Sequence, residues 1–446
     1  MAQFLWGPPA LILLMGVGVY LTITLKFYPQ RRIFPTLRSL IKKNEKNSGK
    51  ASEGVSPLAA LMTSLAACIG TGNVVGVAVA ISIGGPGALV WMWLSALVGM
   101  TTQFAECALA VRYREKNAAG EYCGGPMYTL KNGLKNRHLG IILGTAFAVF
   151  TVTASFGIGN MVQSNSIAQA VSYSFDVKSQ ISGAVMTAAV AVAVMGGIKT
   201  ISAVSGVLVP VMAVMYIVGG VIVMVGNASG VLTGLKDIFA SAFGAKAVSG
   251  GVAVSFLTVL RQGVSKGVFS NEAGLGTSAV TAAAAETESH IKQGYVSMCA
   301  TFIDTIIVCS VTGIVIASAG LYRNGDMTSA DLVIASFETV LGRLGGYVVT
   351  LGIVLFAYAS IPGWEYIGEK SLEFLVKKKI YCYIYRIVFC AMVYTGAVLT
   401  ADKVWELSDI ANACMMFPNL VSIVALSGKI RHDTIMYERQ NKMLKN

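Results

Sequence analysis

The hexapeptide Cys68-Ile69-Gly70-Thr71-Gly72-Asn73 lies in the middle of a long apolar segment, residues 58–83. The segment is long and uncharged enough to be a membrane-spanning helix, but two glycines and an asparagine fall where the bilayer midplane would be. Backbone groups freed by a break have no water to bond with in hydrocarbon, so a break is tolerated only beside a cavity buried in protein. The sequence therefore predicts a broken helix that lines a site.

A second stretch of this kind, Gly267-Val268-Phe269-Ser270-Asn271-Glu272-Ala273-Gly274-Leu275-Gly276, lies inside another long apolar segment, about halfway down the chain. Paired interrupted segments in corresponding halves of a sequence point to the binding site of a secondary transporter. We therefore expect the two breaks to meet at one central site.

Composition places the whole chain in a membrane. Of its 446 residues, 55% are hydrophobic and 13% are charged, whereas soluble domains carry about 25% charged residues. Hydropathy predicts an all-α polytopic protein with eleven spans. We place these spans at 4–25, 58–83, 87–111, 139–170, 180–198, 201–226, 250–285, 293–320, 344–369, 380–400 and 404–427.

The net charge of +12 is explained by topology, so we expect no nucleic-acid partner. Lysine and arginine are concentrated in alternate connections, and the positive-inside rule then places the amino terminus outside and the carboxyl terminus in the cytoplasm. The first span has no preceding positive charge and no small-residue cleavage pattern, which favours a retained helix over a signal peptide. The main basic connections are 26–57, 112–138, 370–386 and 429–446.

Outside the breaks, the sequence contains one basic segment with two possible interpretations, and cysteines and histidines to which we assign no site. Residues 31–43 mix apolar and basic side chains, as expected either for a helix along the inner membrane surface or for a solvated basic loop. The eight cysteines form no CxxC pair and are read as small apolar residues, not as a metal site or disulfide framework. The three histidines fall in connections, and we assign them no role.

The residues of the first break suit both ends of a zwitterion. The half-helix that follows Gly70 exposes N–H groups at Thr71, Gly72 and Asn73, which favour a carboxylate. The half-helix before it ends in free carbonyls over 66–69, which suit a cation or an ammonium group. Asn73 could add a side-chain oxygen to a cation, or it could make an interhelical hydrogen bond instead.

Two carboxylates lie inside predicted spans, where charge is costly and usually functional. For Glu272 we expect structural pairing with Lys266, which lies one to two turns earlier in the same element. Asp304 has no such local partner. It could act as a cation ligand, as a proton carrier or as an acceptor between helices.

The predicted span 139–170 carries a polar stripe on an otherwise apolar helix. Ser155, Gly159 and Gln163 repeat at four-residue spacing, with Asn160 beside them. Gln163 is long enough to reach a substrate carboxylate or ammonium group. The competing interpretation is a hydrogen bond that joins two helices.

The predicted span 344–369 contains Ser360-Ile361-Pro362-Gly363-Trp364. Pro362 has no N–H, so the carbonyl of Tyr358 loses its helical partner while the Ser360 hydroxyl lies close by. Oxygen atoms freed in this way suit a hard cation such as Na⁺. Trp364 is either an interfacial anchor or a pocket wall that limits substrate size.

Three motifs of the sequence are specific. They are Gly84-Gly85-Pro86-Gly87-Ala88-Leu89-Val90-Trp91-Met92-Trp93-Leu94-Ser95-Ala96-Leu97-Val98-Gly99, Gly120-Glu121-Tyr122-Cys123-Gly124-Gly125-Pro126-Met127-Tyr128 and Phe269-Ser270-Asn271-Glu272-Ala273-Gly274-Leu275-Gly276. These motifs resemble those of the alanine or glycine:cation symporters, also called sodium:alanine symporters, and the resemblance covers essentially the whole chain. The first motif departs from the family pattern, because Val90 stands where phenylalanine is usual. The resemblance implies a LeuT-like fold of five-plus-five inverted repeats, with one additional N-terminal helix and two broken helices.

The resemblance also implies a substrate and a coupling ion: a small neutral amino acid carried with Na⁺, or in some members with H⁺. A sodium ion between the first and eighth core helices would pair Ser360 with carbonyls near Ala66 and Ile69, and we add Asn73 to this cation set. The substrate-binding residues that we expect are Thr71, Gly72, Asn73, Gln163, Ser270, Asn271, Gly274 and Trp364.

We therefore expect a sodium-coupled symporter of alanine or glycine, monomeric and embedded in the cell's inner membrane, that works by alternating access. A proton-coupled amino acid symporter is the alternative, followed by an ion channel. An enzyme is not expected, because the spans contain no nucleophile–base pair or metal-spaced cluster. The expected parts are 1–57 (first helix and basic linker), 58–226 (first repeat), 227–428 (second repeat) and 429–446 (cytoplasmic tail).

Overall fold

The computed structural model describes residues 7–43, 55–243, 248–249, 252–399 and 401–443. It is helical nearly throughout, as the apolar composition requires, because a helix satisfies its own backbone groups in lipid. Two short antiparallel strand pairs lie in the described connections, β1 (Glu115–Lys116) with β2 (Tyr122–Cys123) and β3 (Val248–Ser249) with β4 (Val252–Ala253).

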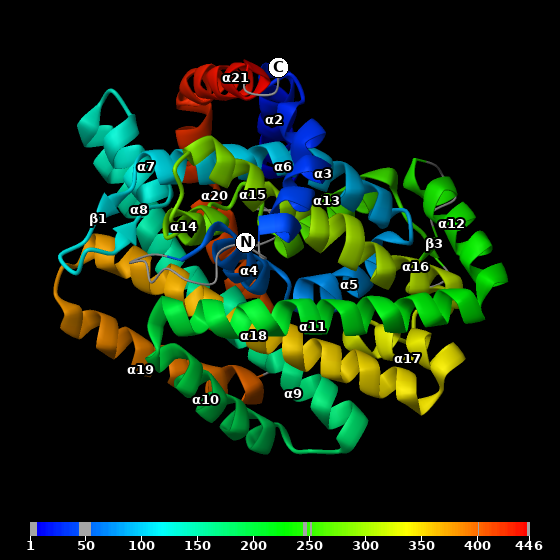
Figure 1. Ribbon diagram of the computed structural model, residues 1–446. Helices are drawn as coiled ribbons and strands as arrows, with labels where there is room; N and C mark the ends of the chain where they lie inside the picture. Colours follow the sequence, from blue (N-terminus) through cyan, green and yellow to red (C-terminus); the bar gives the residue numbers. More distant parts are fainter. Residues whose placement is uncertain (1–6, 44–54, 244–247, 250–251, 400, 444–446) are drawn as a thin grey trace.

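The helices follow one another along the chain as shown in Figure 1. The first part contains α2 (Pro8–Thr24), α3 (Tyr28–Lys43), α4 (Pro57–Cys68), η1 (Thr71–Asn73), α5 (Val75–Gly84), α6 (Ala88–Arg112), α7 (Pro126–Gly133), α8 (Arg137–Phe156), η2 (Gly157–Met161), α9 (Val162–Phe175), α10 (Ser179–Met195) and α11 (Gly197–Gly226). The second part contains α12 (Ala228–Ala242), α13 (Phe256–Asn271), α14 (Thr277–Ala283), α15 (His290–Thr301), η3 (Phe302–Cys309), α16 (Ser310–Ala319), η4 (Leu321–Arg323), α17 (Ser329–Leu341), α18 (Arg343–Leu375), α19 (Lys379–Val398), α20 (Ala401–Ala425) and α21 (Ser427–Met443).

The all-helical polytopic class predicted from the sequence is confirmed. Among the described residues, six helices are long and apolar enough to cross a membrane, and nine spans result if each bent pair is one span. The sequence predicts eleven. Three of the connections that it leaves without structure contain helices, α7, α12 and α17. The span expected from residue 250 has its helix begin only at Phe256, where the Ser255 side chain accepts a hydrogen bond from the Thr258 amide as an N-cap.

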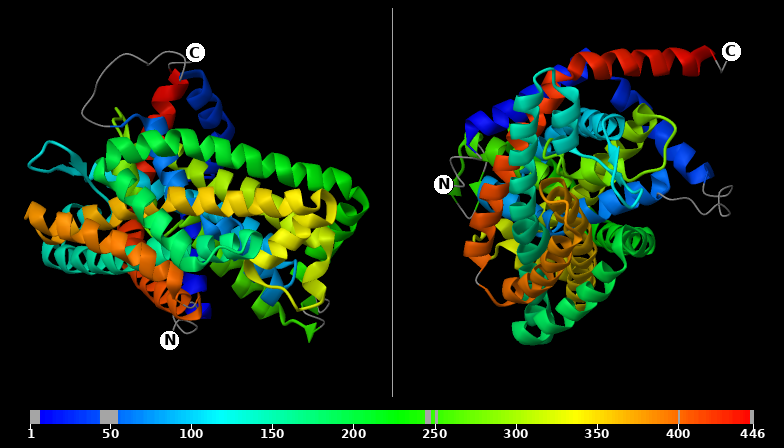
Figure 2. Two further views of the ribbon diagram at one scale, coloured as in Figure 1. Left: turned by 90° about the horizontal axis from the view of Figure 1, so that it is seen from below. Right: turned by 90° about the vertical axis from the view of Figure 1, so that its left-hand side faces the viewer.

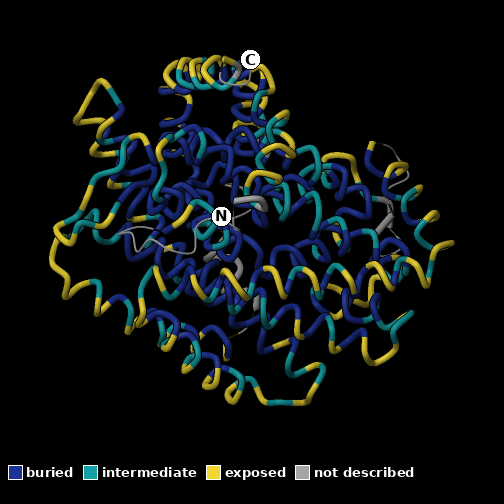
Figure 3. The backbone as a smooth tube through the Cα atoms, in the orientation of Figure 1, coloured by how far each residue is buried: buried dark blue, intermediate teal, exposed yellow. Residues whose placement is uncertain are grey.

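The outer helices carry apolar side chains on their exposed faces. On α11, Val207, Val211, Val214, Val218 and Val225 are all more than half exposed. Figure 3 shows buried backbone in the centre of the molecule and exposed residues along the outer helices. A surface of this kind is stable in contact with lipid tails and would be a liability in water.

The core is built from long helices that pack side by side. The adjacent helices α11 and α18 are visible in Figure 1. Helix α8 contacts both α18 and α20, whereas α6 lies against α13 and α15. This arrangement surrounds the two segments that the sequence predicts to be broken.

Helix α3 settles one alternative left open by the sequence, because residues 28–43 are helical and not a loop. It turns 81° from α2 and packs on α6 and α15, with Ile33 buried. Arg32 binds Glu438 of α21, and the Tyr295 hydroxyl donates to the same carboxylate at 2.8 Å. The basic helix is therefore fixed to the protein on one side.

The segment expected as a cytoplasmic tail forms helix α21, which turns 58° from α20 and lies across the end of the bundle (Figure 2). Asp433 binds Arg112 of α6 and lies 3.0 Å from the Nε2 atom of His290. One of the histidines left without a role is thus part of an ion cluster that attaches this helix.

Candidate functional site

The first broken helix has its break where the sequence predicts it. Helix α4 ends at Cys68, and the chain turns by 60° before it continues through η1 and α5. The Gly70 amide bonds to the side-chain Oδ1 of Asn73 at 3.2 Å, and the Thr71 amide bonds to Oε1 of Gln163 at 3.1 Å. Because these two amides leave the helical ladder, the carbonyls of Ala66 and Ala67 lose their usual partners.

The second break lies between α13 and α14. Helix α13 ends at Asn271, and Glu272 adopts a left-handed conformation with φ of 57°. Gly274 and Gly276 follow with φ of 90° and 84°, which glycine adopts without steric cost. Helix α14 then starts at Thr277.

The two breaks meet. Helix α13 packs along α5 and α14 packs along α4, so the two broken segments run in opposite directions. A Cβ atom on Gly72 would lie only 2.9 Å from the Cα atom of Ser270. The absence of a side chain at Gly72 therefore lets the two backbones come into contact at the breaks.

A cluster of side-chain oxygens lies between the breaks and η3. We call it the oxygen cluster, and it consists of Asn73, Ser270, Asp304 and Thr305, all fully buried. The carboxylate of Asp304 accepts hydrogen bonds from Asn73 Nδ2 at 2.8 Å, Ser270 Oγ at 2.9 Å and Thr305 Oγ1 at 2.8 Å. Asn271 Nδ2 donates to Thr305 Oγ1 at 3.0 Å. Four residues that sequence reasoning singled out thus lie together: Asn73, Ser270, Asn271 and Asp304.

A second group of oxygens lies on the other side of the first break. The Ser360 hydroxyl donates to the freed carbonyl of Ala67 at 2.7 Å. The carbonyl of Ala66 lies one residue earlier, and Ile69 is buried beside it. The structure therefore brings Ser360 to the end of α4, as the proposed pairing with Ala66 and Ile69 requires, although its hydrogen bond goes to Ala67.

Gln163 and Ser360 converge at Gly70. A Cβ atom on Gly70 would lie 2.9 Å from Gln163 Oε1 and 3.2 Å from Ser360 Oγ. The hydroxyl of Thr71 is buried at the same break and has no hydrogen-bond partner. A buried polar atom without a partner is unfavourable, so this hydroxyl is available to a polar ligand.

The polar stripe predicted on one helix face is divided by a π-helical stretch, η2. Gln163 faces the first break, and its Nε2 atom donates to the Ile158 carbonyl, five residues earlier, at 3.1 Å. Ser155 and Asn160 instead face α19, where they bond Tyr385 and the Phe389 carbonyl. The prediction of a single stripe is wrong because a π-turn changes the angular spacing of residues.

Trp364 is fully buried, which excludes a role as an interfacial anchor. Its ring lies so close to Gly159 that a side chain there would overlap it. The indole Nε1 donates to Glu272 Oε1 at 3.0 Å, and Thr277 donates to Glu272 Oε2 at 2.5 Å. The expected pairing of Glu272 with Lys266 is therefore wrong, and the Lys266 ammonium group lies over the ring of Phe269.

Gly274 lies apart from the other predicted substrate-binding residues. It faces Leu14 of α2, Thr102 of α6 and Leu420 of α20, and its carbonyl accepts a hydrogen bond from Asn419 at 2.9 Å. Sequence reasoning also missed Thr305, Cys309 and Thr312, which follow Asp304 in η3 and α16. Their helical spacing after an intramembrane carboxylate was the available signal.

The oxygen atoms fit a hard cation such as Na⁺, which prefers carboxylate, hydroxyl and carbonyl ligands. Among the described residues, no group of three or more histidine, cysteine, aspartate or glutamate side chains is placed to hold a metal. Any ion at this site would therefore be held by mixed side-chain and backbone oxygens, as in transporters with unwound helices.

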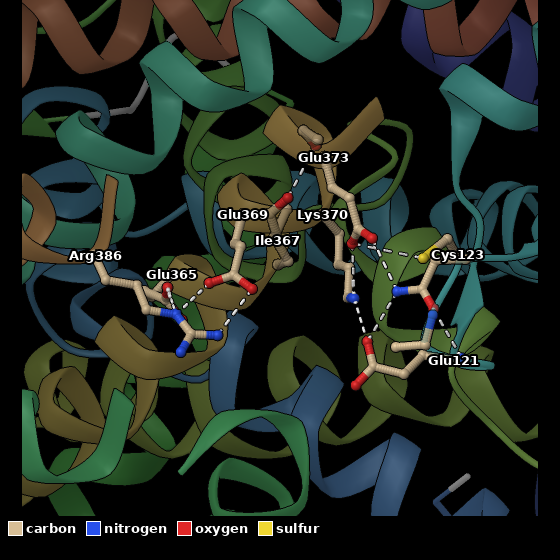
Figure 4. A network of polar contacts seen from close by, with 11 residues as sticks. Glu121, Cys123, Glu365, Ile367, Glu369, Lys370, Glu373 and Arg386 are labelled. Carbon is tan, nitrogen blue, oxygen red and sulfur yellow. Dashed lines mark hydrogen bonds and ion pairs between the residues drawn. The ribbon is translucent and has the colours of Figure 1, made fainter. Parts of the chain in front are cut away.

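A network of ion pairs closes one end of α18 (Figure 4). We call it the α18 ion network, and it consists of Glu121, Lys370 and Glu373. The Lys370 ammonium group donates to both carboxylates at 2.8 Å, and Asn117 donates to Glu373 at 2.8 Å. Cys123 is buried in the same place, with its sulfur 3.7 Å from Glu373. These contacts attach the β1–β2 hairpin to α18.

The network borders a cavity of about 870 Å³. On its other side Arg386 of α19 binds Glu369 of α18. Burial favours a raised pKa for Glu121, but the hydrogen bond and charge of Lys370 outweigh it and hold the pKa below its ordinary value. Such a pair stays ionised at neutral pH and weakens only as the pH falls through that lowered pKa.

A helical membrane bundle in which two oppositely directed broken helices meet at a buried polar site is the architecture of a secondary transporter. The comparisons with known proteins agree. The model of the sodium:alanine symporter family matches residues 1–446. The chain belongs to this family, and so it is a membrane transporter and not an enzyme.

The chain is similar to several known transporters. The sodium/alanine symporter AgcS of Methanococcus maripaludis is 44% identical over 99% of this chain and 96% of its own length. The probable sodium/glutamine symporter GlnT of Bacillus subtilis is 34% identical over 99% of this chain and 90% of its own length. Among solved structures, the nucleobase-cation-symport-1 family transporter Mhp1 is 14% identical, with a TM-score of 0.49 over 81% of this chain and 75% of that chain.

Proposed function

We propose that this protein is a sodium-coupled symporter of small neutral amino acids, alanine and glycine. The observation that carries the proposal is the meeting of the two breaks at the oxygen cluster. There the Asp304 carboxylate is buried with Asn73 and Ser270, and the freed carbonyls of the first break lie on its other side, next to Ser360. The family and its sodium/alanine member AgcS support the same substrate and ion.

The substrate carboxylate would bind at the start of the second half-helix of the first break. The positive end of that half-helix favours an anion, and the unpartnered Thr71 hydroxyl can donate to it. Gly72, Asn73 and Gln163 complete this side, and Ser270 and Asn271 approach from the second break. Trp364 forms the wall opposite. Gly274 would act through the shape of its loop, because it does not face this region.

Na⁺ would be the coupling ion, held at the oxygens on either side of the first break. Ser360 with the carbonyls of Ala66 and Ile69 forms one set, and Asn73 lies next to the carboxylate of Asp304 in the other. Ion and substrate would stabilise the same closed arrangement of the breaks, so each raises the apparent affinity for the other.

The opposite directions of the two broken segments support an inverted repeat of five plus five helices with one additional N-terminal helix, eleven spans in all. We propose 58–226 and 227–428 as the repeats, preceded by 1–57 and followed by 429–446. The distribution of basic residues supports a cytoplasmic carboxyl terminus and an external amino terminus in the plasma membrane. We further propose that the monomer is the functional unit.

The primary test is uptake of labelled alanine and glycine into proteoliposomes. An inward Na⁺ gradient should drive accumulation, and replacing Na⁺ with K⁺ should abolish it. Accumulation driven by a proton gradient without Na⁺ would instead establish the proton-coupled alternative. Conduction without saturation by substrate would establish a channel. Competition by glutamine in the same assay tests whether the substrate range extends to that of GlnT.

Replacement of Ser360 by alanine should weaken activation by Na⁺. The variant loses one hydroxyl ligand beside the Ala67 carbonyl. A hydrogen bond or ligand of this kind is worth about 1 kcal/mol, which is about a fivefold change in the Na⁺ concentration for half-maximal uptake. Ser371→Ala is a matched control, because this serine is on the same helix and, within the described part of the chain, its hydroxyl bonds to the Ile367 carbonyl alone. Equal Na⁺ dependence of the two variants would remove Ser360 from the ion site.

Alternating access requires that the α18 ion network open to the cytoplasm. Lys370 lies six residues beyond Trp364 on the same helix, about 9 Å along its axis. The network is therefore placed between the substrate region and the α18 end. Burial raises the pKa of the Cys123 thiol to about 12, so the thiol is unreactive while the network is closed.

Replacement of Lys370 by glutamine should open this end and make Cys123 reactive. We expect maleimide labelling of Cys123 to be at least about tenfold faster in the variant, because labelling follows the exposed thiolate fraction. The labelling rate is measured by mass spectrometry, with Cys123→Ala to identify the site. Lys378→Gln, in an exposed lysine of the same cavity, is the matched control. Unchanged labelling in Lys370→Gln would contradict the gating role.

A further inference from the structure

Glu106 is a buried carboxylate that the proposed transport site does not use. It lies on α6 and is 2% exposed. Its Oε2 atom accepts a hydrogen bond from Asn419 Nδ2 at 2.7 Å, and the same amide nitrogen donates to the Gly274 carbonyl at 2.9 Å. The backbone amides of Gly274 and Gly276 also face the carboxylate. Glu106 is thus connected to the loop that forms the second break.

The other carboxylate oxygen, Oε1, is buried and has no hydrogen-bond partner, and the same is true of Asn419 Oδ1. Among the described residues, no lysine, arginine or histidine makes an ion pair with Glu106. Asn419 and the two glycine amides replace only part of the hydration that an ionised carboxylate would lose here, so burying the charged form costs more than burying the neutral acid. A proton on Oε1 would make this oxygen a hydrogen-bond donor and would remove the charge from the buried carboxylate.

A metal ion fits this place poorly. Hard cations take several oxygen ligands, and here the Gly274 carbonyl is already used by Asn419. Besides Asn419, the side chains around Gly274 and Gly276, the loop residues that face the carboxylate, present apolar atoms. They are Leu14 of α2, the methyl group of Thr102 on α6, Pro126 of α7, Phe147 of α8 and Leu420 of α20.

Titratable groups on α6, on the loop of the second break, and on α15 and η3, which pack against α6, have partners of their own or belong to neutral side chains. On α6 itself these are Cys107 and Arg112, the latter bound to Asp433 of α21. Glu272, at the start of the same loop, is turned toward Trp364 and Thr277. On α15, Tyr295 donates to Glu438 and His290 lies against Asp433; η3 contributes Asp304, which is bound within the oxygen cluster.

We propose that Glu106 is a proton-binding site, and that its neutral form holds the loop of the second break in the arrangement seen here. Loss of the proton leaves a charge in an apolar enclosure, so the loop must move or admit water to solvate it. That movement disturbs Asn271 and Ser270, which precede the loop. In the symporter proposed above, the fraction of molecules in which Glu106 is protonated therefore sets the fraction in which the substrate site is correctly formed.

The first test is the pH dependence of Na⁺-driven alanine uptake by the full chain in proteoliposomes. Because the protonated form is the active one, wild-type uptake should fall as the pH rises. Once Glu106 has lost its proton in most molecules, the fall should be about tenfold for each further pH unit, as for the titration of a single group. Glu106→Gln, which keeps the size and polarity of the neutral acid, should remove this fall and leave uptake at low pH within about twofold of wild type. Glu115→Gln, a control in a carboxylate outside the spans, should keep the wild-type profile. A profile in Glu106→Gln that matches wild type would overturn the inference.

The second test needs no transport, so it separates this inference from the proposed function. Infrared spectra of the purified protein should contain a carbonyl band of a protonated carboxylic acid that disappears in Glu106→Gln. If that variant does not fold, Asn419→Ala is measured instead. It keeps the carboxyl group but removes its partner, so the band should shift in frequency. A spectrum identical to wild type in the measured variant would show that Glu106 carries no proton.

Discussion

Replacement of Asp304 by alanine should abolish sodium-driven uptake. The carboxylate is the acidic member of the oxygen cluster and accepts hydrogen bonds from Asn73, Ser270 and Thr305. Alanine removes the charged ligand, and an interaction with a charged group is worth about 1.5–3 kcal/mol, which corresponds to a roughly 10- to 100-fold loss of Na⁺ affinity. The measurement is the Na⁺ concentration that gives half-maximal alanine uptake.

Asp304→Asn tests whether the effect on Na⁺ dependence comes from the negative charge of the side chain or from its size and shape. It keeps one acceptor oxygen and a similar volume, so it should fold as wild type does and still require far more Na⁺. Thermal stability in detergent, measured for both variants, checks that the protein is folded. Wild-type Na⁺ dependence in Asp304→Ala would place the ion elsewhere and reduce the cluster to a set of interhelical hydrogen bonds.

Replacement of Gly72 by alanine should have the second large effect. The new Cβ atom would lie 2.9 Å from the backbone of Ser270, and backbone cannot move aside as a flexible side chain can. Overpacking of this kind costs about 1–3 kcal/mol, which corresponds to a roughly 10- to 100-fold loss in the apparent affinity for alanine. The measurement is the alanine concentration for half-maximal uptake at saturating Na⁺.

Gly76→Ala is the matched control, because it adds the same methyl group four residues later in the same broken segment. There the nearest atom, on the ring of Phe269, is 4.0 Å away. This variant should transport like wild type. Similar losses in both variants would indicate a general intolerance of α5 to alanine and would contradict the close approach of the breaks.

The positions of both breaks could be predicted from the sequence because the membrane makes a broken helix costly. Glycines and an asparagine at 70–73, in an otherwise apolar segment, have no simpler explanation than a cavity. The same reasoning selected Ser270, Asn271 and Ser360, which the structure places beside the first break. Glycines and polar residues within an apolar segment predict a site because an unpaired polar group inside the membrane costs much free energy.

The partners of the carboxylates could not be predicted, because they come from distant parts of the chain. Glu272 was expected to bind Lys266 through regular helical spacing. Its left-handed backbone conformation ends the helix at that residue and turns the side chain toward Trp364. Asn73 and Asp304, which bond directly, are separated by 231 positions.

Hydropathy also missed the helices that attach to the bundle through charge. Helix α21 is strongly polar, and besides the buried Ile430 its contacts with the bundle include the ion pairs of Glu438 and Asp433. A window that averages hydropathy assigns such a segment to solvent, since it contains no signal for an ion pair with a distant arginine. The same limitation hides the α18 ion network.

The π-helical stretches η2 and η3 have a consequence for how these helices deform. Each is a widened turn in the middle of a long helix, and each carries or borders a site residue, Gln163 or Asp304. A widened turn holds one surplus residue that can be absorbed into ordinary winding or released again, so one half of the helix can rotate relative to the other without stretching the chain. Two such turns lie next to the breaks. They allow the backbone at the centre of the molecule to rearrange, although the lipid bilayer makes every unpaired peptide group costly.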